Sequence, residues 1–423
     1  MTLSEVESVT RENGMFRVKI SQNPRYVLLD KCTGCGTCEE KCPKKIPNEF
    51  NEDLDKRKSI HFLFPQSIPQ APRIDYENCI YFRTGKCKAC EKFCEADAID
   101  FEQKEEIIEK DFNSIVVATG GKPYEPVGRK EYGYGEYANV ITSIQLERLL
   151  SASGPTMGEV LTSEGKHPKS VAFINCVGSR DEKVGHEYCS RICCMYGLKE
   201  AFLVREHDPE VDITIFYMDI RSPGKGYDEF YRKIRYEDKT AKFIRTRPAE
   251  ISENDDASLT IRYEDTQAGT IDELTVDMVV LNVAIVPSDG TKELAEKLGV
   301  NLNEYGFFDK SDFSSAPLDT SDEGIYVCGM ASRPLDITDT TCQGIGAASR
   351  ATSDVLAERT FPAPAGYADL ETDENKTGVF VCHCGKNIAS VVDVKDLTEY
   401  AKGLPNVVCA EDNNFSCSEE GQR

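Results

Sequence analysis

The chain of 423 residues has no tryptophan, few histidines and fewer basic than acidic residues. Lys and Arg total 50 against 73 Asp and Glu, so the formal net charge is -23 at pH 7. Because this charge repels nucleic acids and anionic membrane surfaces, we expect no nucleic-acid partner. The sequence also lacks an apolar run near the length of about 20 residues that crosses a bilayer, so we expect no membrane span.

A dinucleotide-binding glycine signature is also missing from its usual place. No GxGxxG follows the predicted strands at the N-terminus. The related string GCGTCE lies inside a cysteine motif, and GIGAAS lies in a predicted late helix. Neither string therefore predicts a site for a pyrophosphate.

Cysteine is abundant, with 18 residues in tight groups. Secreted disulfide frameworks normally occur in short chains behind a cleavable leader, and we recognise no such leader here. The grouping instead favours metal ligands in a reducing cytoplasm.

Two cysteine runs have the spacing of a bacterial two-cluster ferredoxin. The first run contains Cys32, Cys35, Cys38 and Cys42, and the second contains Cys79, Cys87, Cys90 and Cys94. The second run departs from the pattern by a longer first gap and by Glu95 in place of proline. In ferredoxins the fourth cysteine of each run binds the other cluster. This rule assigns one [4Fe-4S] cluster to Cys32, Cys35, Cys38 and Cys94, and the other to Cys79, Cys87, Cys90 and Cys42. Structural zinc is the alternative, but two coupled runs disfavour it.

A third group follows the predicted strand SVAFIN and contains Cys176, Cys189, Cys193 and Cys194. Its spacing does not match a ferredoxin run. The adjacent Cys193 and Cys194 could form a redox-active disulfide. Alternatively, all four thiols hold a cluster, with a helix N-terminus favouring the thiolates. The residues alone leave both interpretations open.

Strands alternating with helices predict a layered α/β body. The first residues predict a hairpin with a turn at Asn13 and Gly14, and ITSIQLERLLSA predicts a helix. A later long helix has start signals at Asp336, Thr338 and Asp339.

Several longer motifs together resemble the A subunit of heterodisulfide reductase over essentially the whole chain. They include CTGCGTCEEKCP, VVATGG, CVGSRDEKVGHEYCSRICCMYGLKEA, PLDITDT and VFVCHCGKNIASVVDV. The resemblance implies a thioredoxin-reductase-like body with two dinucleotide domains, into which an α+β ferredoxin-like domain with two [4Fe-4S] clusters is inserted. It further implies that the third cysteine group binds a [4Fe-4S] cluster beside a flavin, which makes three clusters.

On this basis we divide the chain into seven segments. They are 1–25, a remnant of the FAD domain; 26–106, the ferredoxin-like insertion; 107–164, an FAD-domain segment; 165–287, an NAD-domain-like unit converted to a cluster site; 288–360, the C-terminal part of the FAD domain; 361–376, a linker; and 377–423, the start of a second, truncated N-terminal-type module.

The resemblance also implies an FAD site and a catalytic lysine. The residues expected to line the FAD site are Thr119, Gly120, Gly121, Gly329, Asp336, Ile337, Thr338 and Gln343. A helix beginning near Asp339 could direct its positive end towards the flavin and stabilise an anionic reduced form. Lys199 matches a family lysine near the flavin N5 atom, although an ordinary solvated helix lysine is the alternative.

Both ends of the sequence depart from the family pattern. The first βαβ unit, which holds the adenosine diphosphate of FAD, would precede Met1, so we expect weak FAD binding or none by this chain alone. Near the C-terminus, Cys382, Cys384 and Cys417 resemble ligands of a fourth cluster, which we expect to be incomplete. Cys409 is a candidate substitute ligand.

The expected function is electron transfer between FAD and [4Fe-4S] clusters in a heterodisulfide-reductase-type complex of methanogenesis, with electron bifurcation as an option. The expected partners are subunits B and C, an electron-donor subunit of hydrogenase or formate dehydrogenase, and ferredoxin. Two alternatives remain. One is a related subunit of quinone-linked or sulfur metabolism, and the other is a flavin-free adaptor that carries clusters only.

Overall fold

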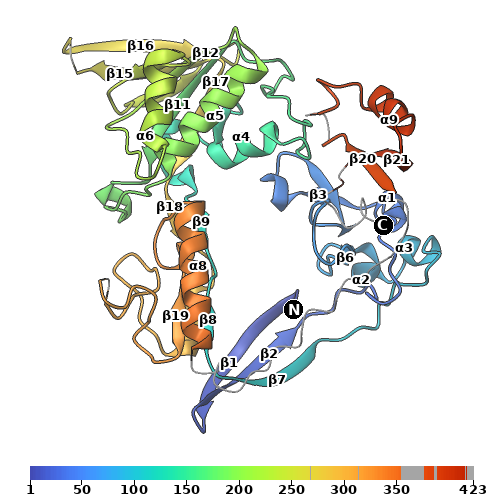
Figure 1. The fold of residues 1–423 in the computed structure, drawn as a ribbon. Coiled ribbons are helices and arrows are strands. Elements are labelled where there is room, and N and C mark those ends of the chain that lie inside the picture. The colour runs from blue at the N-terminus through green and yellow to red at the C-terminus, as the bar shows by residue number, and fades with distance from the viewer. Residues whose placement is uncertain (267, 313, 354–375, 385–387, 415, 417–423) are drawn as a thin grey trace.

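The computed structural model describes residues 1–423 except 267, 313, 354–375, 385–387, 415 and 417–423. Its elements form four regions (Figure 1). A large α/β region lies above a smaller one that contains α8, and the cysteine-rich region and a C-terminal unit lie to the right of both. Together they confirm the predicted α/β class. Among the described residues, no helix combines the length and apolar character needed to cross a bilayer.

The large α/β region is built on a five-stranded parallel sheet of order β10-β17-β11-β12-β13. The strands are β10 (Val140–Thr142), β11 (Ser170–Val177), β12 (Asp212–Phe216), β13 (Lys242–Ile244) and β17 (Met278–Val283). Both faces are covered, which explains why β11 and β17 are nearly continuous apolar runs.

Successive residues of β11 point to opposite faces of this sheet. Val171 and Phe173 pack in the core under the helices α4 (Ser143–Leu150) and α5 (Cys193–His207). Ala172 and Ile174 join the core on the other face. An antiparallel sheet covers that face and consists of β14 (Glu250–Glu253), β15 (Leu259–Asp265) and β16 (Thr270–Val276). The helix α6 (Tyr227–Arg232) follows β12 in the chain. The strands β15 and β16 form an antiparallel hairpin that leads into the buried strand β17.

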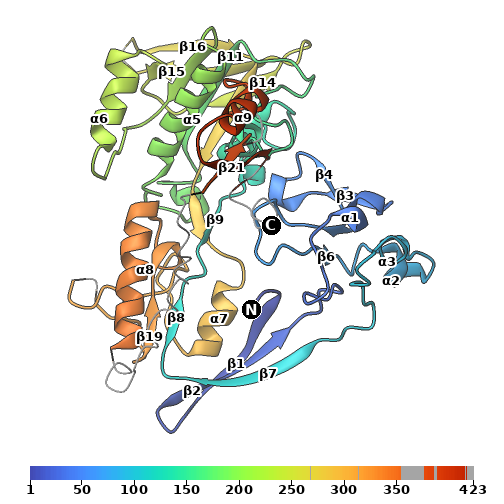
Figure 2. The same ribbon diagram turned by 45° about the vertical axis from the view of Figure 1, so that its right-hand side comes forward.

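The smaller α/β region pairs segments that are far apart in the sequence. Its elements are β8 (Ile115–Val117), β9 (Gly121–Pro123), β18 (Ile285–Pro287), α7 (Thr291–Leu298), β19 (Ile325–Val327) and α8 (Ile337–Thr352). The strands β8 and β19 are parallel, and β9 pairs with β18 in the connection to the large region (Figure 2). Val117, Val327 and Phe308 belong to its core.

The N-terminal strands complete this core. The sheet contains β1 (Ser4–Glu12), β2 (Met15–Gln22) and β7 (Glu106–Phe112), all antiparallel. Asn13 and Gly14 both have positive φ, at 51° and 81°, as a two-residue hairpin turn requires. Phe16 and Val18 of β2 pack against the smaller α/β region. The predicted hairpin is confirmed.

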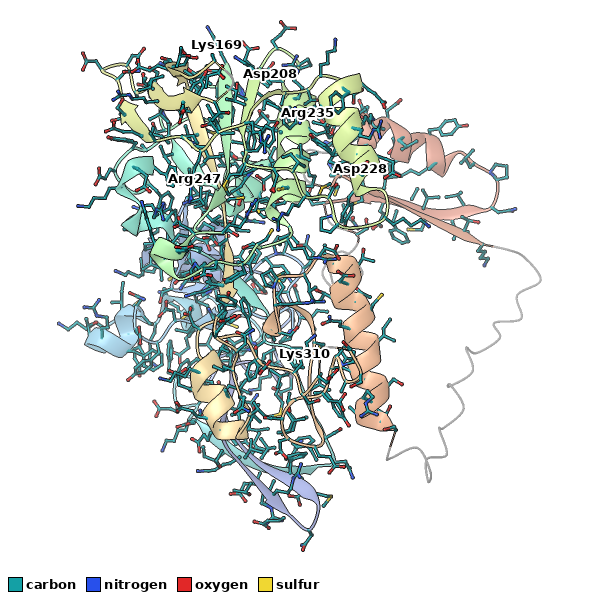
Figure 3. All side chains as sticks on the ribbon, turned by 90° about the vertical axis from the view of Figure 1, so that its left-hand side faces the viewer. Lys169, Asp208, Asp228, Arg235, Arg247 and Lys310 are labelled. Atoms are coloured by element: carbon teal, nitrogen blue, oxygen red, sulfur yellow. The ribbon has the colours of Figure 1, made fainter. Side chains whose placement is uncertain are left out.

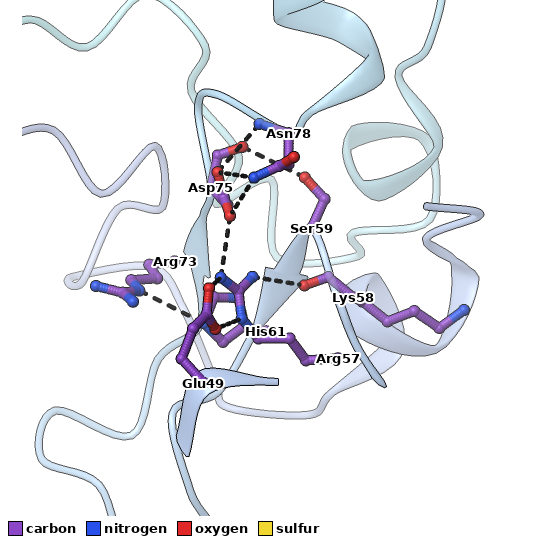
Figure 4. Close-up of polar contacts among 8 residues, drawn as sticks. All are labelled: Glu49, Arg57, Lys58, Ser59, His61, Arg73, Asp75 and Asn78. Carbon is purple, nitrogen blue, oxygen red and sulfur yellow. Dashed lines mark hydrogen bonds and ion pairs between the residues drawn. The ribbon is translucent and has the colours of Figure 1, made fainter. Parts of the chain in front are cut away.

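The cysteine-rich region contains only short elements. They are α1 (Thr37–Lys41), β3 (Lys45–Pro47), β4 (Lys56–Lys58), β5 (Ile60–His61), β6 (Arg73–Ile74), α2 (Ile80–Thr84) and α3 (Ala89–Lys92). An ion-pair network lies among β4, β5 and the turn after β6 (Figure 4). At its centre the buried Arg57 guanidinium donates to Asp75 at 3.0 Å and to Glu49 at 2.6 Å. Burial, followed by the charges of Arg57 and Arg73, lowers the pKa of His61 to about 4, so this ring is neutral. The network joins the short elements of this region to one another.

The C-terminal unit is a β-α-β arrangement of β20 (Thr377–Cys382), α9 (Val394–Lys402) and β21 (Val407–Asn413), with parallel strands. The expected linker 361–376 lies outside the described residues except for Lys376, and Cys417 lies outside them too. The domain boundaries given above remain predictions.

Candidate iron–sulfur and flavin sites

Two cavities in the cysteine-rich region are each surrounded by four thiols. The first is lined by Cys32, Cys35, Cys38 and Cys94. The second is lined by Cys42, Cys79, Cys87 and Cys90. Each cavity takes three thiols from one run and the fourth from the other. This is the arrangement that the ferredoxin rule predicts.

The inserted residues of the second run do not displace Cys79. It lies at the residue before α2 and is buried beside Ile74 and Ile80 at the second cavity. Within the described residues, no three Cys, His, Asp or Glu side chains converge as the ligands of a single metal ion would. The thiols surround a space instead, and this arrangement fits a four-iron cluster.

The surroundings of these thiols are apolar. Burial raises the pKa of Cys38 to about 12, and it does the same for Cys90. The nearby thiols add to both shifts because neighbouring thiolates would repel one another. Iron would reverse the balance, since a metal-bound cysteine is deprotonated.

The third cysteine group gathers at the end of β11. Cys176 ends the apolar stretch of this strand with a left-handed φ of 64°, and Cys193 and Cys194 are the first residues of α5. All three are buried, whereas Cys189 is partly exposed and its Sγ accepts from the Arg191 N–H at 3.3 Å. All four are free thiols, so Cys193 and Cys194 are not joined as a disulfide.

Hydrogen bonds set the ionisation of these thiols. A hydrogen bond from Cys193, helped by the charge of Arg180 and opposed by burial, lowers the pKa of Cys176 to about 7. The same hydrogen bond raises the pKa of Cys193 well above its usual value. The backbone strain at Cys176 and the clustering of thiols are both typical of a functional site. Cys176, Cys193 and Cys194 contact one another at this strand end, and together with Cys189 of the same loop they supply the four-thiol donor set of a [4Fe-4S] cluster.

Asp181 anchors the loop that carries this group. Its buried carboxylate accepts from Arg129 Nη1 at 2.5 Å and from Arg247 Nη2 at 2.7 Å. Arg247 is labelled in Figure 3, on the large α/β region. Although burial acts to raise the pKa of Asp181, the two arginines outweigh it and lower this pKa. This anchor was not predicted from the sequence, because Arg129 and Arg247 lie far from Asp181 in the chain.

The residues expected at the flavin lie at the ends of β8 and β19. Gly329 has a φ of 64°, and its N–H donates to the Gln343 side chain at 3.0 Å. A Cβ at Gly329 would approach Thr340 to 3.0 Å, and a Cβ at Gly121 would approach the Val286 carbonyl to 3.0 Å. A side chain at either position would require these neighbours to shift by a few tenths of an ångström.

The other residues expected at the flavin include a glycine turn and an exposed helix start. Gly120 has a φ of 75°, and the Thr119 carbonyl accepts from Ser288 Oγ at 2.9 Å. Asp336 caps α8 by accepting from the Asp339 N–H at 2.8 Å, which confirms the predicted helix start. Ile337 and Thr338, in the first turn of α8, are exposed. Glycine loops and an exposed helix start fit a flavin, and the individual contacts remain predictions.

One ion pair joins the third cysteine group to this segment. Arg191 Nη2 contacts Asp339 Oδ2, and the two residues are 148 positions apart in the sequence. The cysteine loop thus lies at the start of α8.

The Lys199 side chain is directed towards helix α4 and not towards the residues expected at the flavin. Its ammonium group pairs with Glu147 of α4. Glu147 also lies beside the buried Glu200, whose pKa is raised well above its usual value by burial and then by the charge of Glu147. The catalytic role of Lys199 remains a prediction.

The C-terminal unit brings two of its expected ligands together. Cys382 Sγ accepts from the Cys384 N–H at 3.2 Å, and Cys384 has a left-handed φ of 47°. Cys409 lies on β21, opposite Gly378 of β20. A fourth cluster remains a prediction.

Comparisons with known proteins agree with the site geometry. Residues 25–47, which contain the first cysteine run, match the 4Fe-4S binding domain family. The A subunit of the H2:CoB-CoM heterodisulfide,ferredoxin reductase of Methanothermobacter thermautotrophicus is 46% identical over 383 residues, which is 90% of this chain. The iron-sulfur A subunit of the CoB–CoM heterodisulfide reductase of Methanocaldococcus jannaschii is 46% identical over 82% of this chain.

The chain belongs to the family of heterodisulfide reductase A subunits. A Methanosarcina acetivorans member, the A subunit of its ferredoxin:CoB-CoM heterodisulfide reductase, is 40% identical over 83% of the chain. The chain spans about half the length of these family members, at 56%, 52% and 47% of the three. Among solved structures, the thioredoxin reductase of Lactococcus lactis aligns with 61% of this chain and 72% of its own, with a TM-score of 0.38 and 19% identity.

Proposed function

We propose that this chain is an oxidoreductase subunit that passes electrons between FAD and [4Fe-4S] clusters in a heterodisulfide-reductase-type complex. The observation that carries the proposal is the contact between Arg191 and Asp339. This contact supports a flavin site beside the third group of four thiols, because Asp339 lies at the helix start that suits a flavin. A one-electron centre beside a two-electron centre is the arrangement that such a protein needs.

Each part of the site has a distinct task in this proposal. The thiol groups hold three clusters, and Asp181 with its two arginines keeps the third group in position. FAD, when bound, exchanges electrons in pairs or singly, whereas the clusters take them singly. The capped start of α8 favours negative charge on a flavin ring, because its free N–H groups carry partial positive charge.

The proposed partners are subunits B and C, an electron-donor subunit of hydrogenase or formate dehydrogenase, and ferredoxin. The printed names of the relatives support this, since they refer to hydrogen, ferredoxin and the CoB-CoM heterodisulfide. Within such a complex we assign reduction of the heterodisulfide to another subunit. Bifurcation at the flavin is part of the same proposal.

A second candidate is a flavin-free adaptor that carries electrons through its clusters only. The observation that favours it is the exposure of apolar side chains on the expected flavin segment. Val116 of β8 is 39% exposed, and Ile337 and Ile345 of α8 are 85% and 68% exposed. In this alternative, the exposed apolar side chains of the segment form a surface on which a partner protein docks.

Anaerobic purification followed by iron, sulfide and flavin quantification separates the two candidates. About twelve irons per chain with about one FAD is the result expected of the electron-transfer protein. The same iron without FAD, even after incubation with excess FAD, would favour the adaptor. Zinc in place of iron would contradict both.

A further inference from the structure

A large cavity is lined by Cys189 and Arg191 of the third cysteine group's loop. Its volume is about 740 Å³, within the range of about 300–1,000 Å³ that is usual for small-molecule sites. Four separate segments line it: residues 188–191 of the cysteine loop, 221–223 after β12, 303–307 before β19, and 333–334 before α8. The expected FAD residues Thr119, Gly120, Gly121 and Gly329 do not belong to this lining.

One wall of the cavity is aromatic and held in place. The Tyr188 ring contacts Tyr305, with centroids 4.8 Å apart, and Phe307, with centroids 5.8 Å apart. The Tyr188 hydroxyl donates to the Ile285 carbonyl at 2.7 Å. Because ring packing and the hydrogen bond of its hydroxyl both hold this ring in place, it offers a pre-formed surface for a flat ligand.

The cavity lining is also cationic. Arg191, Arg221 and Arg333 all line the cavity, and none of the described lining residues is acidic. Arg191 pairs with Asp339, and Arg221 lies 3.5 Å from Asp219. Burial, followed by the nearby charge of Arg191, lowers the pKa of Arg333. Three guanidinium groups around one cavity are unusual in a chain with a net charge of -23, and an anion would stabilise them.

We propose that this cavity binds a small anion that carries a planar aromatic ring, of the class of nucleoside phosphates. The ring would stack on Tyr188 and Tyr305, and the anionic group would pair with Arg221 and Arg333. Cys189 also lines the cavity, so the ligand lies against the third cysteine group. The proposal does not depend on the electron-transfer function, because binding can occur whatever the cofactor content.

Calorimetric titration of the anaerobically purified, cluster-loaded chain with adenosine monophosphate tests the proposal. We expect a submillimolar dissociation constant, with adenosine and inorganic phosphate each binding at least about tenfold more weakly. Arg221→Gln should weaken adenosine monophosphate binding about tenfold, since a charge-assisted hydrogen bond is lost, and should leave adenosine binding unchanged. Tyr305→Leu should instead weaken both, since stacking is lost.

The matched control is Arg232→Gln, which removes an arginine of α6 that is not among the described residues lining the cavity. Unchanged iron content and thermal unfolding of each variant show that the fold persists. The proposal is overturned by a wild-type dissociation constant above about 10 mM, or by equal affinity of Arg221→Gln and wild type. Release of bound FAD in proportion to adenosine monophosphate binding would also overturn it, because the cavity would then be part of the flavin site.

Discussion

Two thiols of the cysteine-rich region and one thiol at the end of β11 have pKa values that are shifted in opposite directions. In the cysteine-rich region, apolar burial raises the pKa of Cys38 and of Cys90 to about 12, and the two cavities are near-equivalents. At the end of β11, hydrogen bonding and Arg180 lower the pKa of Cys176 to about 7. The same ligand type is thus placed in two electrostatic settings by the residues around it.

The charge beside each cysteine group affects how readily its cluster takes up an electron. Arg180 places a positive charge near the third group, and positive charge near a cluster stabilises its reduced form, whereas an apolar shell does not. We therefore expect the third cluster to differ in reduction potential from the other two.

The largest expected effect tests the equivalence of the two cavities. Cys94→Ala should remove the cluster of the first run, and Cys42→Ala should remove that of the second run, each with a loss of about four irons per chain. Iron analysis and EPR of the reduced protein measure the loss. Cys342→Ala is the control, because this exposed cysteine lies on α8. If Cys94→Ala removed the second-run cluster instead, the cross-over assignment would be wrong.

The next effect tests what holds the third group in place. Asp181→Asn leaves the side chains of Arg129 and Arg247 without their shared carboxylate, so we expect a loss of about 3 kcal/mol in the free energy of unfolding. Urea unfolding of the two proteins measures it. Asp238→Asn is a suitable control, because its pair with Lys233 is exposed and should contribute less than about 1 kcal/mol. Equal effects of the two substitutions would show that Asp181 is not an anchor.

A smaller effect concerns the opposite pKa shifts in the cluster-free, reduced chain. The folded-state pKa of Cys176 lies below its ordinary value of 9.0, so its stabilising contribution is present above pH 9 and is lost as the pH falls through 7. Cys38 and Cys90 behave in the opposite sense, with stability lost as the pH rises from 9 towards 12. The contribution of Cys176 should be at most about 3 kcal/mol, since folding lowers its pKa from 9.0 to about 7.

Urea unfolding of wild type and Cys176→Ser between pH 6 and 10 measures this contribution. The stability difference between the two proteins should grow with pH from about 7 to 9. A difference that is constant over this interval would show that the pKa of Cys176 is not lowered by folding.

The smallest effect concerns Lys199. An exposed pair of the kind formed with Glu147 contributes about 0.5 kcal/mol, so Lys199→Gln should have little effect on stability. Glu147→Gln breaks the same pair and serves as the matched control. If Lys199 acts only through the pair, both variants should leave the flavin reduction potential unchanged. A shift with Lys199→Gln alone would support the predicted role beside the flavin.

Many features of this protein can be predicted from residues that lie close together in the sequence. The ligand types, the two ferredoxin spacings and their cross-over, the hairpin turn at Asn13 and Gly14, and the cap of α8 at Asp336 are all predictable without the fold. Each depends on residues within one motif or one turn, so their spacing is sufficient. The family motifs add the third cysteine group to the features that the sequence predicts.

Only the tertiary structure decided which distant residues meet. Asp181 meets Arg129 and Arg247 because β11 lies between segments that are remote in the chain, and Arg191 meets Asp339 across 148 positions. The arginine-lined cavity likewise forms from four segments that no spacing links. The physical reason is that packing of the two α/β regions fixes these contacts, and single side chains such as Arg221 carry no local signal of the surface they will face.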